Sequence, residues 1–490
     1  MSSLKKQVVR DTLTYTFANY VAMAIGIFVS VATKAILGAV GAGYWAILKV
    51  FISYGEYSDL GTRNAMIREI PRVIGAGKAH EARKTENSAF AFTALTALFS
   101  AVVIAWVAWS VTDPLLKKGL WISSGLVVAT QIYNFSLTLL RTLKRIGVLS
   151  VVIVLNMLLV GAFSIAGATW RGVLGMAAGV CLSTAISAGI AYFLGKMRFQ
   201  LRWNSAEILR LIKIGSPMVV ISYALVTFLS LDTLMIGKMI GIREAGLYTI
   251  GLMSVQQIGA LGRFSQIILL PHIQERYGRT GSLPDTAALM IRTTRVLAHL
   301  VPFLIAFVLF FVPVVVHYFL PKFTSGLASM KVLVLGYYFV VVNELSANAA
   351  FTADKQKHLI PFLGVLIALA AVLNYVFIRL GFGIEGVAVA TSISYFLFFV
   401  VVFSFAFSHL VQFSQVRTAV IEILGLFLYF LVCVLIAEFL GNVIPQIFLA
   451  ACVKFLIFAL LFFPAFYRIE KNERLFGVLK SLFRRSPALS

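Results

Sequence analysis

The chain has 490 residues, of which 60% are hydrophobic and only 12% are charged, and its mean hydropathy is +0.95. Soluble globular domains carry about a quarter charged residues, so this composition excludes a soluble domain and indicates an integral membrane protein. The formal net charge of +23 would suggest a nucleic-acid partner in a soluble protein. Membrane proteins, however, collect Lys and Arg in their cytoplasmic loops, so we expect no nucleic-acid partner here.

The first apolar run covers residues 13–37. It is too long for the apolar part of a signal peptide and lacks a cleavage site, so we expect it to be the first membrane span. The three cysteines, Cys181, Cys433 and Cys452, lie in apolar runs without paired spacing or a nearby His. We expect them to be reduced core residues, and we predict neither a disulfide nor a metal site.

Apolar runs of about 20 residues, the length that spans a bilayer, follow one another along the chain. Backbone groups in lipid must bond internally and the alternating pattern of a barrel is missing from the sequence, so these runs should be α-helices. The sequence therefore predicts an all-α integral membrane fold with about 14 transmembrane helices. Their expected ranges are 13–37, 43–64, 89–112, 119–140, 148–169, 173–195, 214–237, 245–269, 296–319, 331–352, 359–380, 384–408, 418–440 and 444–466.

The basic residues are distributed unevenly over the breaks between these runs. Of the 42 Lys and Arg residues, 8 fall in the breaks after odd-numbered helices, whereas 30 fall in the alternate breaks and the two termini. Cytoplasmic loops carry the excess of Lys and Arg. We therefore predict that both termini are cytoplasmic, which requires an even number of helices.

The sequence also contains an internal repeat, which is visible in two pairs of similar stretches. "AILGAVGAGYWAI" (35–47) is similar to "LMIGKMIGIREAGLYTI" (234–250), and "RGVLGMAAGVCLSTAIS" (171–187) is similar to "FGIEGVAVATSISYF" (382–396). Offsets of about 200 residues leave six helices in each copy, which predicts a parallel repeat about an axis along the membrane normal. Two six-helix lobes around a central cavity are an arrangement typical of an alternating-access transporter. The expected parts are an N-terminal lobe (1–205), a C-terminal lobe (206–410), and helices 13 and 14 with a basic cytoplasmic tail (411–490).

Four stretches resemble a known family in their order and spacing, over most of residues 1–410. They are "YSDLGTRNAMIREIPR", "LLRTLKRIG", "SLDTLMIGKMIGIREAGLYTIGLM" (230–253) and "VLNYVFIRLGFGIEGVAVATSIS". This pattern resembles the polysaccharide-transport branch of the multidrug/oligosaccharidyl-lipid/polysaccharide (MOP) exporter superfamily, which includes the O-antigen flippases of the Wzx type.

The resemblance implies a flippase that moves an undecaprenyl-pyrophosphate-linked oligosaccharide repeat unit, an O-antigen or exopolysaccharide precursor, from the inner to the outer leaflet. It implies a multi-pass protein of the inner (cytoplasmic) membrane, acting in lipopolysaccharide or other polysaccharide biosynthesis beside other polysaccharide-assembly membrane proteins. A lipid II flippase or a multidrug antiporter of the same superfamily is the alternative. Drug antiporters usually carry an Asp within helix 1, whereas the acid nearest helix 1 here is Asp11, at its mouth. No cofactor is expected besides a coupling H+ or Na+.

A pyrophosphate-sugar headgroup needs a hydrated cavity with positive charge, and charges inside a span are costly unless they face such a cavity. Lys49, Glu56 and Arg63 recur at intervals of seven in the second predicted helix, and Asp59 lies one turn beyond Glu56. These spacings predict one polar stripe. Lys49 and Glu56 are expected to line the cavity. Asp59 and Arg63 either line it as well or simply lie at the water-exposed cytoplasmic end of the helix.

Aligning Gly43 with Gly246 places the eighth predicted helix on the second. Gln256, Arg263 and Gln266 then form the matching polar stripe. A lone guanidinium in a span needs an anion, so Arg263 is the first candidate to contact phosphate. A structural pair with Glu56 or Asp59 is the other interpretation.

Further charged residues fall within or at the ends of the spans. Lys34 and Asp232 are expected near the outer ends of related helices, where they contribute to the site, lie at the membrane interface or pair with each other. Glu344 lies within the tenth predicted helix, and a carboxylate there is a candidate proton or sodium coupling site, as is Asp232. Charged residues of the last two predicted helices either line a lipid groove or pair together: Glu422, Glu438 and Lys454.

A membrane enzyme such as a glycan polymerase or ligase acting on the same carrier is a hypothesis from another class. It would require a large outer loop with catalytic residues, and all predicted outer breaks are short. We therefore expect a transporter and not an enzyme, with the bilayer and a lipid-linked oligosaccharide as its partners.

Overall fold

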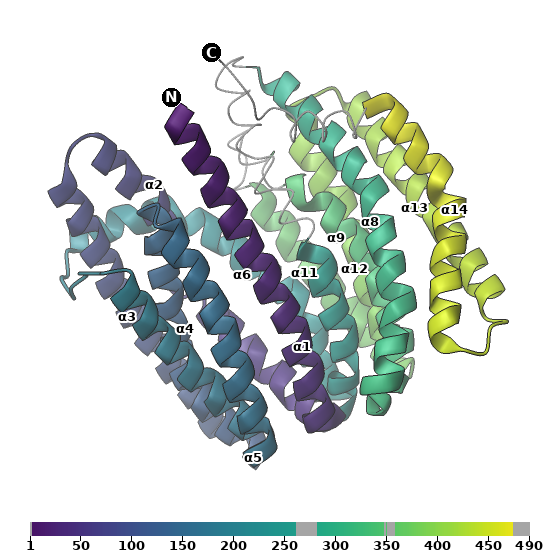
Figure 1. Ribbon diagram of the computed structural model, residues 1–490, viewed down its shortest axis with the longest axis horizontal. Helices are drawn as coiled ribbons and strands as arrows, with labels where there is room; N and C mark the ends of the chain where they lie inside the picture. The colour runs from purple at the N-terminus through teal and green to yellow at the C-terminus, as the bar shows by residue number, and fades with distance from the viewer. Residues whose placement is uncertain (1, 261–281, 347–348, 350–357, 474–490) are drawn as a thin grey trace. The chain divides into compact units, whose positions relative to one another are not determined.

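The computed structural model describes residues 2–260, 282–346, 349 and 358–473. Every regular element in these ranges is a helix (Figure 1). The chain forms two compact units, residues 1–249 and 250–490. The predicted all-α class is confirmed, whereas the lobe boundary near residue 205 and the side of the membrane on which the termini lie stay predictions.

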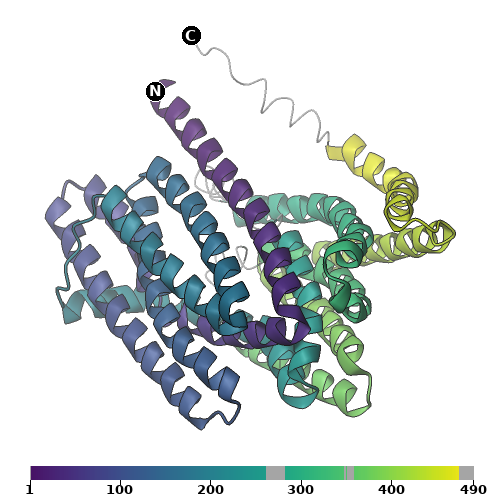
Figure 2. The same ribbon diagram turned by 60° about the horizontal axis from the view of Figure 1, so that its bottom comes forward.

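The first unit contains six helices and the start of a seventh helical segment, 242–260. Figures 1 and 2 show α1 running beside α5, and α4 packs between α5 and α3. The core between α4 and α5 is apolar and includes Phe135, Leu139 and Leu149, all fully buried. The helices are α1 (Ser2–Gly55), α2 (Thr62–Gly75), α3 (Ala79–Ser110), α4 (Pro114–Thr142), α5 (Ile146–Leu194) and α6 (Ser205–Met239).

Two of these helices are each broken at a glycine. Gly38 has φ 66° inside α1, and Gly172 has φ 58° inside α5. Positive φ disfavours side chains with a Cβ, so glycine permits the break. The two halves of α5 then pack back on each other so closely that a Cβ on Gly167 would overlap the Gly175 carbonyl. Each long helix therefore supplies two predicted spans, 13–37 with 43–64 and 148–169 with 173–195.

The glycines at the breaks follow the predicted repeat. Counting back five residues from Gly43 and Gly246, the aligned pair, gives Gly38 and Gly241, which both lie at a helix break, with φ values of 66° and 157°. The second pair of similar stretches aligns Gly172 with Gly383, whose φ values are 58° and 60°. Both pairs of equivalent positions thus lie at helix breaks, and the second pair also has nearly the same φ.

The second unit is a bundle in which α9 and α11 both pack on α12, while α8 packs on α9, α13 and α14. The α13–α14 pair follows α12, with a short connection between its two helices (Figure 1). The helices of the second unit are α8 (Leu283–Phe319), α9 (Leu327–Val342), α11 (Leu359–Arg379), α12 (Gly383–Ser408), α13 (Phe413–Gly441) and α14 (Ile447–Glu473), with short 3-10 turns η1 (Pro321–Gly326) and η2 (Asn343–Leu345).

Ten helical segments of the described ranges are long and apolar enough to cross a membrane. Two of the ten, Leu13–Gly55 and Ile146–Leu194, contain the breaks just described, and α4 and the helix over 242–260 supply the two further predicted spans. Each of the predicted helices thus has a counterpart, and the protein is a multi-pass membrane protein.

Several helix boundaries differ from the prediction. α3 begins at Ala79 and α8 at Leu283, about three turns before the expected starts, because hydropathy detects only the apolar part of a helix. Another error concerns the second predicted helix, 43–64, which ends at Gly55. A turn follows it, and then the unpredicted amphipathic helix α2.

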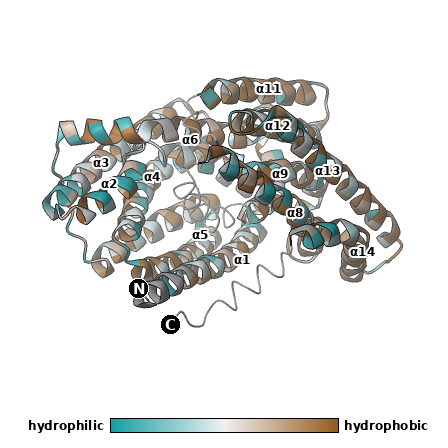
Figure 3. Ribbon diagram, turned by 90° about the horizontal axis from the view of Figure 1, so that it is seen from above, coloured by the Kyte–Doolittle hydropathy of each residue, from teal (hydrophilic) through white to brown (hydrophobic). Residues whose placement is uncertain are grey.

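Helix α2 is more polar than its neighbours. In Figure 3 hydrophilic colouring marks parts of α2, whereas α11 is mostly hydrophobic. Ala65, Met66 and Ile70 form the buried face of α2, which packs on α3 and α6, and Arg68 and Arg72 are exposed. This pattern is typical of a helix at a membrane surface.

Candidate functional site

The polar centre of the first unit is the turn between α1 and α2. After Gly55 the backbone turns through Glu56–Gly61, where Leu60 and Gly61 have positive φ values of 48° and 82°. A leucine with positive φ is unusual and indicates that tertiary contacts hold the turn. One such contact is with α6, since a Cβ on Gly61 would overlap the Gly215 carbonyl.

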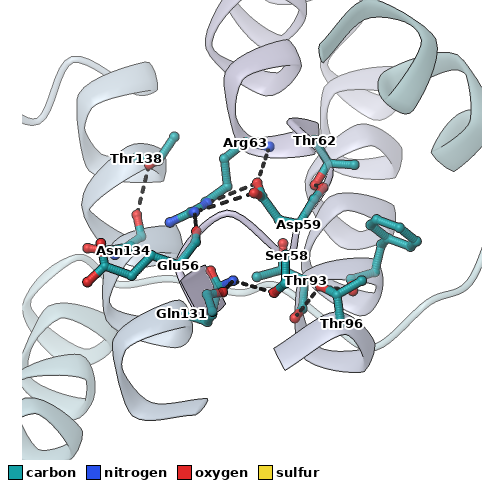
Figure 4. A network of polar contacts seen from close by, with 12 residues as sticks. Glu56, Ser58, Asp59, Thr62, Arg63, Thr93, Thr96, Gln131, Asn134 and Thr138 are labelled. Atoms are coloured by element: carbon teal, nitrogen blue, oxygen red, sulfur yellow. Dashed lines mark hydrogen bonds and ion pairs between the residues drawn. The ribbon is translucent and has the colours of Figure 1, made fainter. Parts of the chain in front are cut away.

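Asp59 and Arg63 form a buried ion pair in this turn (Figure 4). Arg63 Nε lies 2.9 Å from Asp59 Oδ2, and the side chains are only 14% and 3% exposed. The backbone N–H of Arg63 donates to the same carboxylate oxygen at 3.1 Å, and Arg63 Nη2 donates to the Glu56 carbonyl. The Asp59 carboxylate therefore accepts a hydrogen bond from a backbone N–H of the first turn of α2, and it holds the Arg63 side chain over the end of α1.

Gln131 of α4 holds the turn from the other side (Figure 4). Its Nε2 donates to the Gly55 carbonyl and to Ser58 Oγ, both at 2.7 Å, and its side chain is fully buried. The contact bridges 76 residues of sequence. Sequence reasoning missed Gln131, although an amide in an apolar run was a signal that could have identified it.

Tyrosines join the same turn to α6. Tyr54 Oη donates to Thr227 Oγ1 at 2.9 Å, and the Tyr54 ring stacks on Tyr223 at 6.3 Å between centroids. Tyr57 lies 5.9 Å from Tyr223. These half-buried rings form an aromatic surface beside the ion pair, of the kind that sugars and apolar ligands contact, and the sequence analysis did not identify it.

Lys34 and Lys49 lie on the two sides of the Gly38 break. Lys34 Nζ donates to Ser30 Oγ at 2.9 Å, and the Lys49 side chain is exposed between buried Leu48 and Val50. Lys34 and Lys49 interact electrostatically with each other, and Lys49 also interacts with Glu56. In the described parts of the chain, neither lysine forms an ion pair with a carboxylate.

The predicted charged residues of the N-terminal half therefore interact in series. Lys34 interacts with Lys49, Lys49 with Glu56, and Glu56 with Arg63. They do not form the predicted stripe on one continuous helix, because the helix ends at Gly55 and Asp59 and Arg63 belong to the turn and to α2. The turn brings Arg63 back over Glu56, and the series results from this tertiary arrangement.

Asp232 of α6 is buried and has partners other than Lys34. Its carboxylate accepts from Tyr248 Oη at 2.8 Å and from the Thr233 backbone N–H at 2.7 Å. The alternative in which Lys34 and Asp232 pair with each other is therefore wrong for this structure. Asp232 instead connects α6 to the helix over 242–260.

The remaining candidates fall in the second unit or outside the described ranges. Gln256 is exposed on the helix over 242–260, and Glu344 is half-buried in η2. Arg263 and Gln266 lie outside the described residues, so their role stays a prediction. Elsewhere in the second unit, Glu438 pairs with Lys454 at 3.2 Å and with Lys331 at 2.7 Å.

The arrangement in the first unit is suited to binding an anion rather than to covalent chemistry. Two lysines that form no ion pair with any described residue lie in an apolar helix, next to a fixed arginine–aspartate pair and a tyrosine surface. An unpaired cation in a span is stabilised by an anionic ligand or a hydrated cavity.

Comparison with known proteins identifies a family and a fold. A family model described as "Polysaccharide biosynthesis protein" matches residues 76–323. A search of curated proteins finds no match. Among solved structures, the lipid II flippase MurJ in an inward closed conformation has a TM-score of 0.64 at 16% identity, covering 93% of this chain and 99% of that one.

A multidrug resistance MATE family transporter of the MOP superfamily is also similar. Its inward-facing conformation has a TM-score of 0.54 at 17% identity, covering 82% of this chain and 96% of that one. Its outward-facing conformation has a TM-score of 0.52 at 15% identity, with coverage of 83% and 96%. At these identities the likeness shows the fold, which this chain shares with these proteins. The chain belongs to the polysaccharide biosynthesis protein family and has the fold of the MOP superfamily, as the resemblance in its sequence predicts.

Proposed function

We propose that the protein is a flippase that moves an undecaprenyl-pyrophosphate-linked oligosaccharide repeat unit across the inner membrane by alternating access. The family match and the transporter fold support a MOP-type flippase. The substrate follows from the resemblance to the O-antigen and exopolysaccharide branch together with the charge of the site.

One observation carries the proposal: Lys34 and Lys49 are two interacting cations, neither of which forms an ion pair with a carboxylate in the described ranges. Two like charges in an apolar helix repel each other, and a pyrophosphate between them would convert that repulsion into attraction. Each lysine would contact phosphate as a point charge. Tyr54, Tyr57 and Tyr223 would contact the sugar.

The other candidate residues have subordinate roles in this proposal. Glu56 and the Asp59–Arg63 pair would position Lys49 and the end of α1, and Arg263 with Gln256 and Gln266 would contribute further contacts to the headgroup. Asp232 and Glu344 are the proposed sites for a coupling H+ or Na+. Substitution of Arg263 by Ala should abolish export at unchanged protein level, and unchanged surface glycan in that variant would remove Arg263 from the site.

Deletion of the gene in its native host tests the proposal against its alternatives. A flippase for repeat units predicts lipid-linked repeat units accumulating in the inner leaflet and loss of surface glycan. Accumulation of lipid II would instead assign the protein to cell-wall precursors. Normal glycan with increased dye sensitivity would overturn the flippase in favour of a multidrug antiporter.

If the protein were a polymerase or ligase, its deletion would cause a different product to accumulate. Loss of either activity would leave single repeat units, or unattached polymer, on the outer leaflet. Leaflet accessibility of the accumulated lipid, probed by a membrane-impermeant lectin on intact spheroplasts, separates these outcomes. Only protected, inner-leaflet lipid is consistent with a flippase.

A further inference from the structure

The second unit contains a cavity of about 660 Å³ that the proposed flippase site does not use. It lies among α8, α13 and α14 and is lined by both charged and apolar residues. Its opening includes Gly425, which is exposed and where an added Cβ would meet nothing within 4 Å. A bulky group can therefore enter beside α13 without displacing the backbone.

The charged residues of the cavity leave one cation unpaired. Arg295 Nε lies 2.8 Å from Glu422 Oε2, so these two charges neutralise each other. Arg468 is exposed and forms no ion pair within the described ranges, and its charge acts on His299. His299 Nδ1 lies 2.8 Å from the Arg295 carbonyl, which can only accept a hydrogen bond, so Nδ1 carries the hydrogen. The cavity therefore has a net positive charge from Arg468.

The cavity lies near the ends of its helices, at the level expected of lipid headgroups. Arg468 comes three residues before Lys471, where the last apolar span ends, a rise of about 5 Å. Glu422 follows the start of α13 by nine residues, and Arg295 follows the start of α8 by twelve. An unpaired arginine at this depth reaches the membrane interface.

Next to the cavity, α8 and α14 pack on each other through aromatic side chains. Arg295 and His299 begin a series on α8 that continues at every fourth residue as Phe303, Phe307 and Phe311. Phe303 contacts three rings of α14, Phe458, Phe462 and Phe466, with centroids 5.5–5.8 Å apart. A ligand of this cavity must therefore hold its polar part at Arg468 and pass its apolar part outward beside Gly425, into lipid.

We propose that this cavity binds the phosphate headgroup of an anionic membrane lipid, with Arg468 as the principal contact and His299 beside it. The site is separate from Lys34 and Lys49 and does not depend on the transported substrate. Bound lipid would join α14 to α8 and α13 and stabilise the second unit.

The test measures lipid binding by the purified full chain. The protein in dioleoylphosphatidylcholine nanodiscs is supplemented with dioleoylphosphatidylglycerol, and retained lipid is counted by native mass spectrometry. Arg468→Gln should weaken retention about tenfold, the factor that 1.4 kcal/mol represents, and Arg468→Lys should restore part of it. Arg417→Gln removes an exposed cation of α13 outside the cavity and should change nothing.

A second pair of variants tests the cavity itself. Gly425→Leu should fill the opening and reduce retention, whereas Gly364→Leu, at an equally open helical glycine of α11, should not. Inorganic phosphate alone should leave the melting temperature unchanged; stabilisation by phosphate that Arg468→Gln abolishes would assign the cavity to a soluble phosphate compound and overturn the lipid proposal. Equal retention by wild type and Arg468→Gln, or equal loss in Arg417→Gln, would overturn the site.

Discussion

Gly43 and Gly246, the residues that align in the two copies of the repeat, lie directly against each other. A Cβ on Gly43 would overlap the Ile242 carbonyl, and a Cβ on Gly246 would overlap the Ala39 carbonyl. Ile242 and Ala39 are themselves equivalent in the same alignment, so the contact is reciprocal, as in an isologous interface. Glycine allows the two helix backbones to approach this closely.

The reciprocal contact predicts a loss of stability from the smallest possible side chain. In Gly246→Ala or Gly43→Ala the added methyl group meets backbone, which cannot rotate away, and we expect a cost of about 1–3 kcal/mol or more. The measurement is the melting temperature of the detergent-purified protein. Gly189→Ala is the control, since its Cβ would meet nothing within 4 Å; equal melting temperatures for all three variants would contradict the close contact.

Gln131 is predicted to support the turn after α1. Gln131→Met keeps the length of the side chain but removes both hydrogen bonds, leaving the buried Gly55 carbonyl without this donor. We expect a loss of about 1–3 kcal/mol and reduced export, because the turn carries Glu56 and Asp59. Gln412→Met, at an exposed position before α13, is the control. Wild-type stability of Gln131→Met would show that other contacts suffice.

The Asp59–Arg63 pair should behave as a buried ion pair. Asp59→Asn leaves the Arg63 guanidinium buried without its counter-charge, which costs about 3–5 kcal/mol. The double variant Asp59→Asn/Arg63→Met should lose less than the sum of the single losses, and a double-mutant cycle of unfolding free energies measures this coupling. The exposed pair Lys78–Glu81, 3.0 Å apart, is the control in which additive effects are expected. Additive losses at Asp59 and Arg63 would contradict the pairing.

Acid should weaken the attachment of α2 to α6. Burial alone would raise the pKa of Glu207, but hydrogen bonds from Arg210 and Thr85 outweigh it and the pKa is lowered. Arg210 also pairs with Glu69 of α2 at 2.7 Å. Because the pKa is lower in the folded than in the unfolded state, Glu207 stabilises the fold above its unfolded pKa of about 4.3, and this contribution is lost as the pH falls through the folded value.

The corresponding measurement is the melting temperature of wild type and Glu207→Gln between pH 7 and pH 3. The difference in melting temperature between wild type and Glu207→Gln should be constant from neutral pH down to about 5 and should shrink below about 4. A difference that grows with acidification would contradict the lowered pKa. Arg210 is 43% exposed, so added salt should also reduce the difference.

Local sequence determines much of this fold, and those features were predictable. The length of the apolar runs and the glycines at positions 38 and 172 define the spans and the breaks between them. The similarity of residues 35–47 to 234–250 is enough to align Gly43 with Gly246. Such features depend on hydropathy and on glycine, which act within a few residues.

Contacts distant in sequence determine the rest, and those features were missed. The second helix ends at Gly55, where Gln131, 76 residues away, donates a hydrogen bond to the Gly55 carbonyl. The polar stripe predicted from Lys49, Glu56 and Arg63 assumed one continuous helix, so its geometry was wrong although the charges do interact. The partner of Asp232 is Tyr248, not Lys34, since only packing decides which donor reaches a buried carboxylate.

In the proposed mechanism, the two lysines of α1 bind the pyrophosphate of a lipid-linked oligosaccharide that the protein moves between leaflets. The most direct measurement uses proteoliposomes containing the protein and the repeat-unit lipid extracted from the deletion strain, with imposed H+ and Na+ gradients. A membrane-impermeant lectin then reports how much of the lipid has changed leaflet. Wild type should move the lipid at a rate well above empty vesicles, and Lys49→Gln, folded to the same melting temperature, should slow it at least tenfold. Equal rates for Lys49→Gln and wild type would exclude Lys49 from the binding of the pyrophosphate, and no movement by wild-type protein would overturn the flippase.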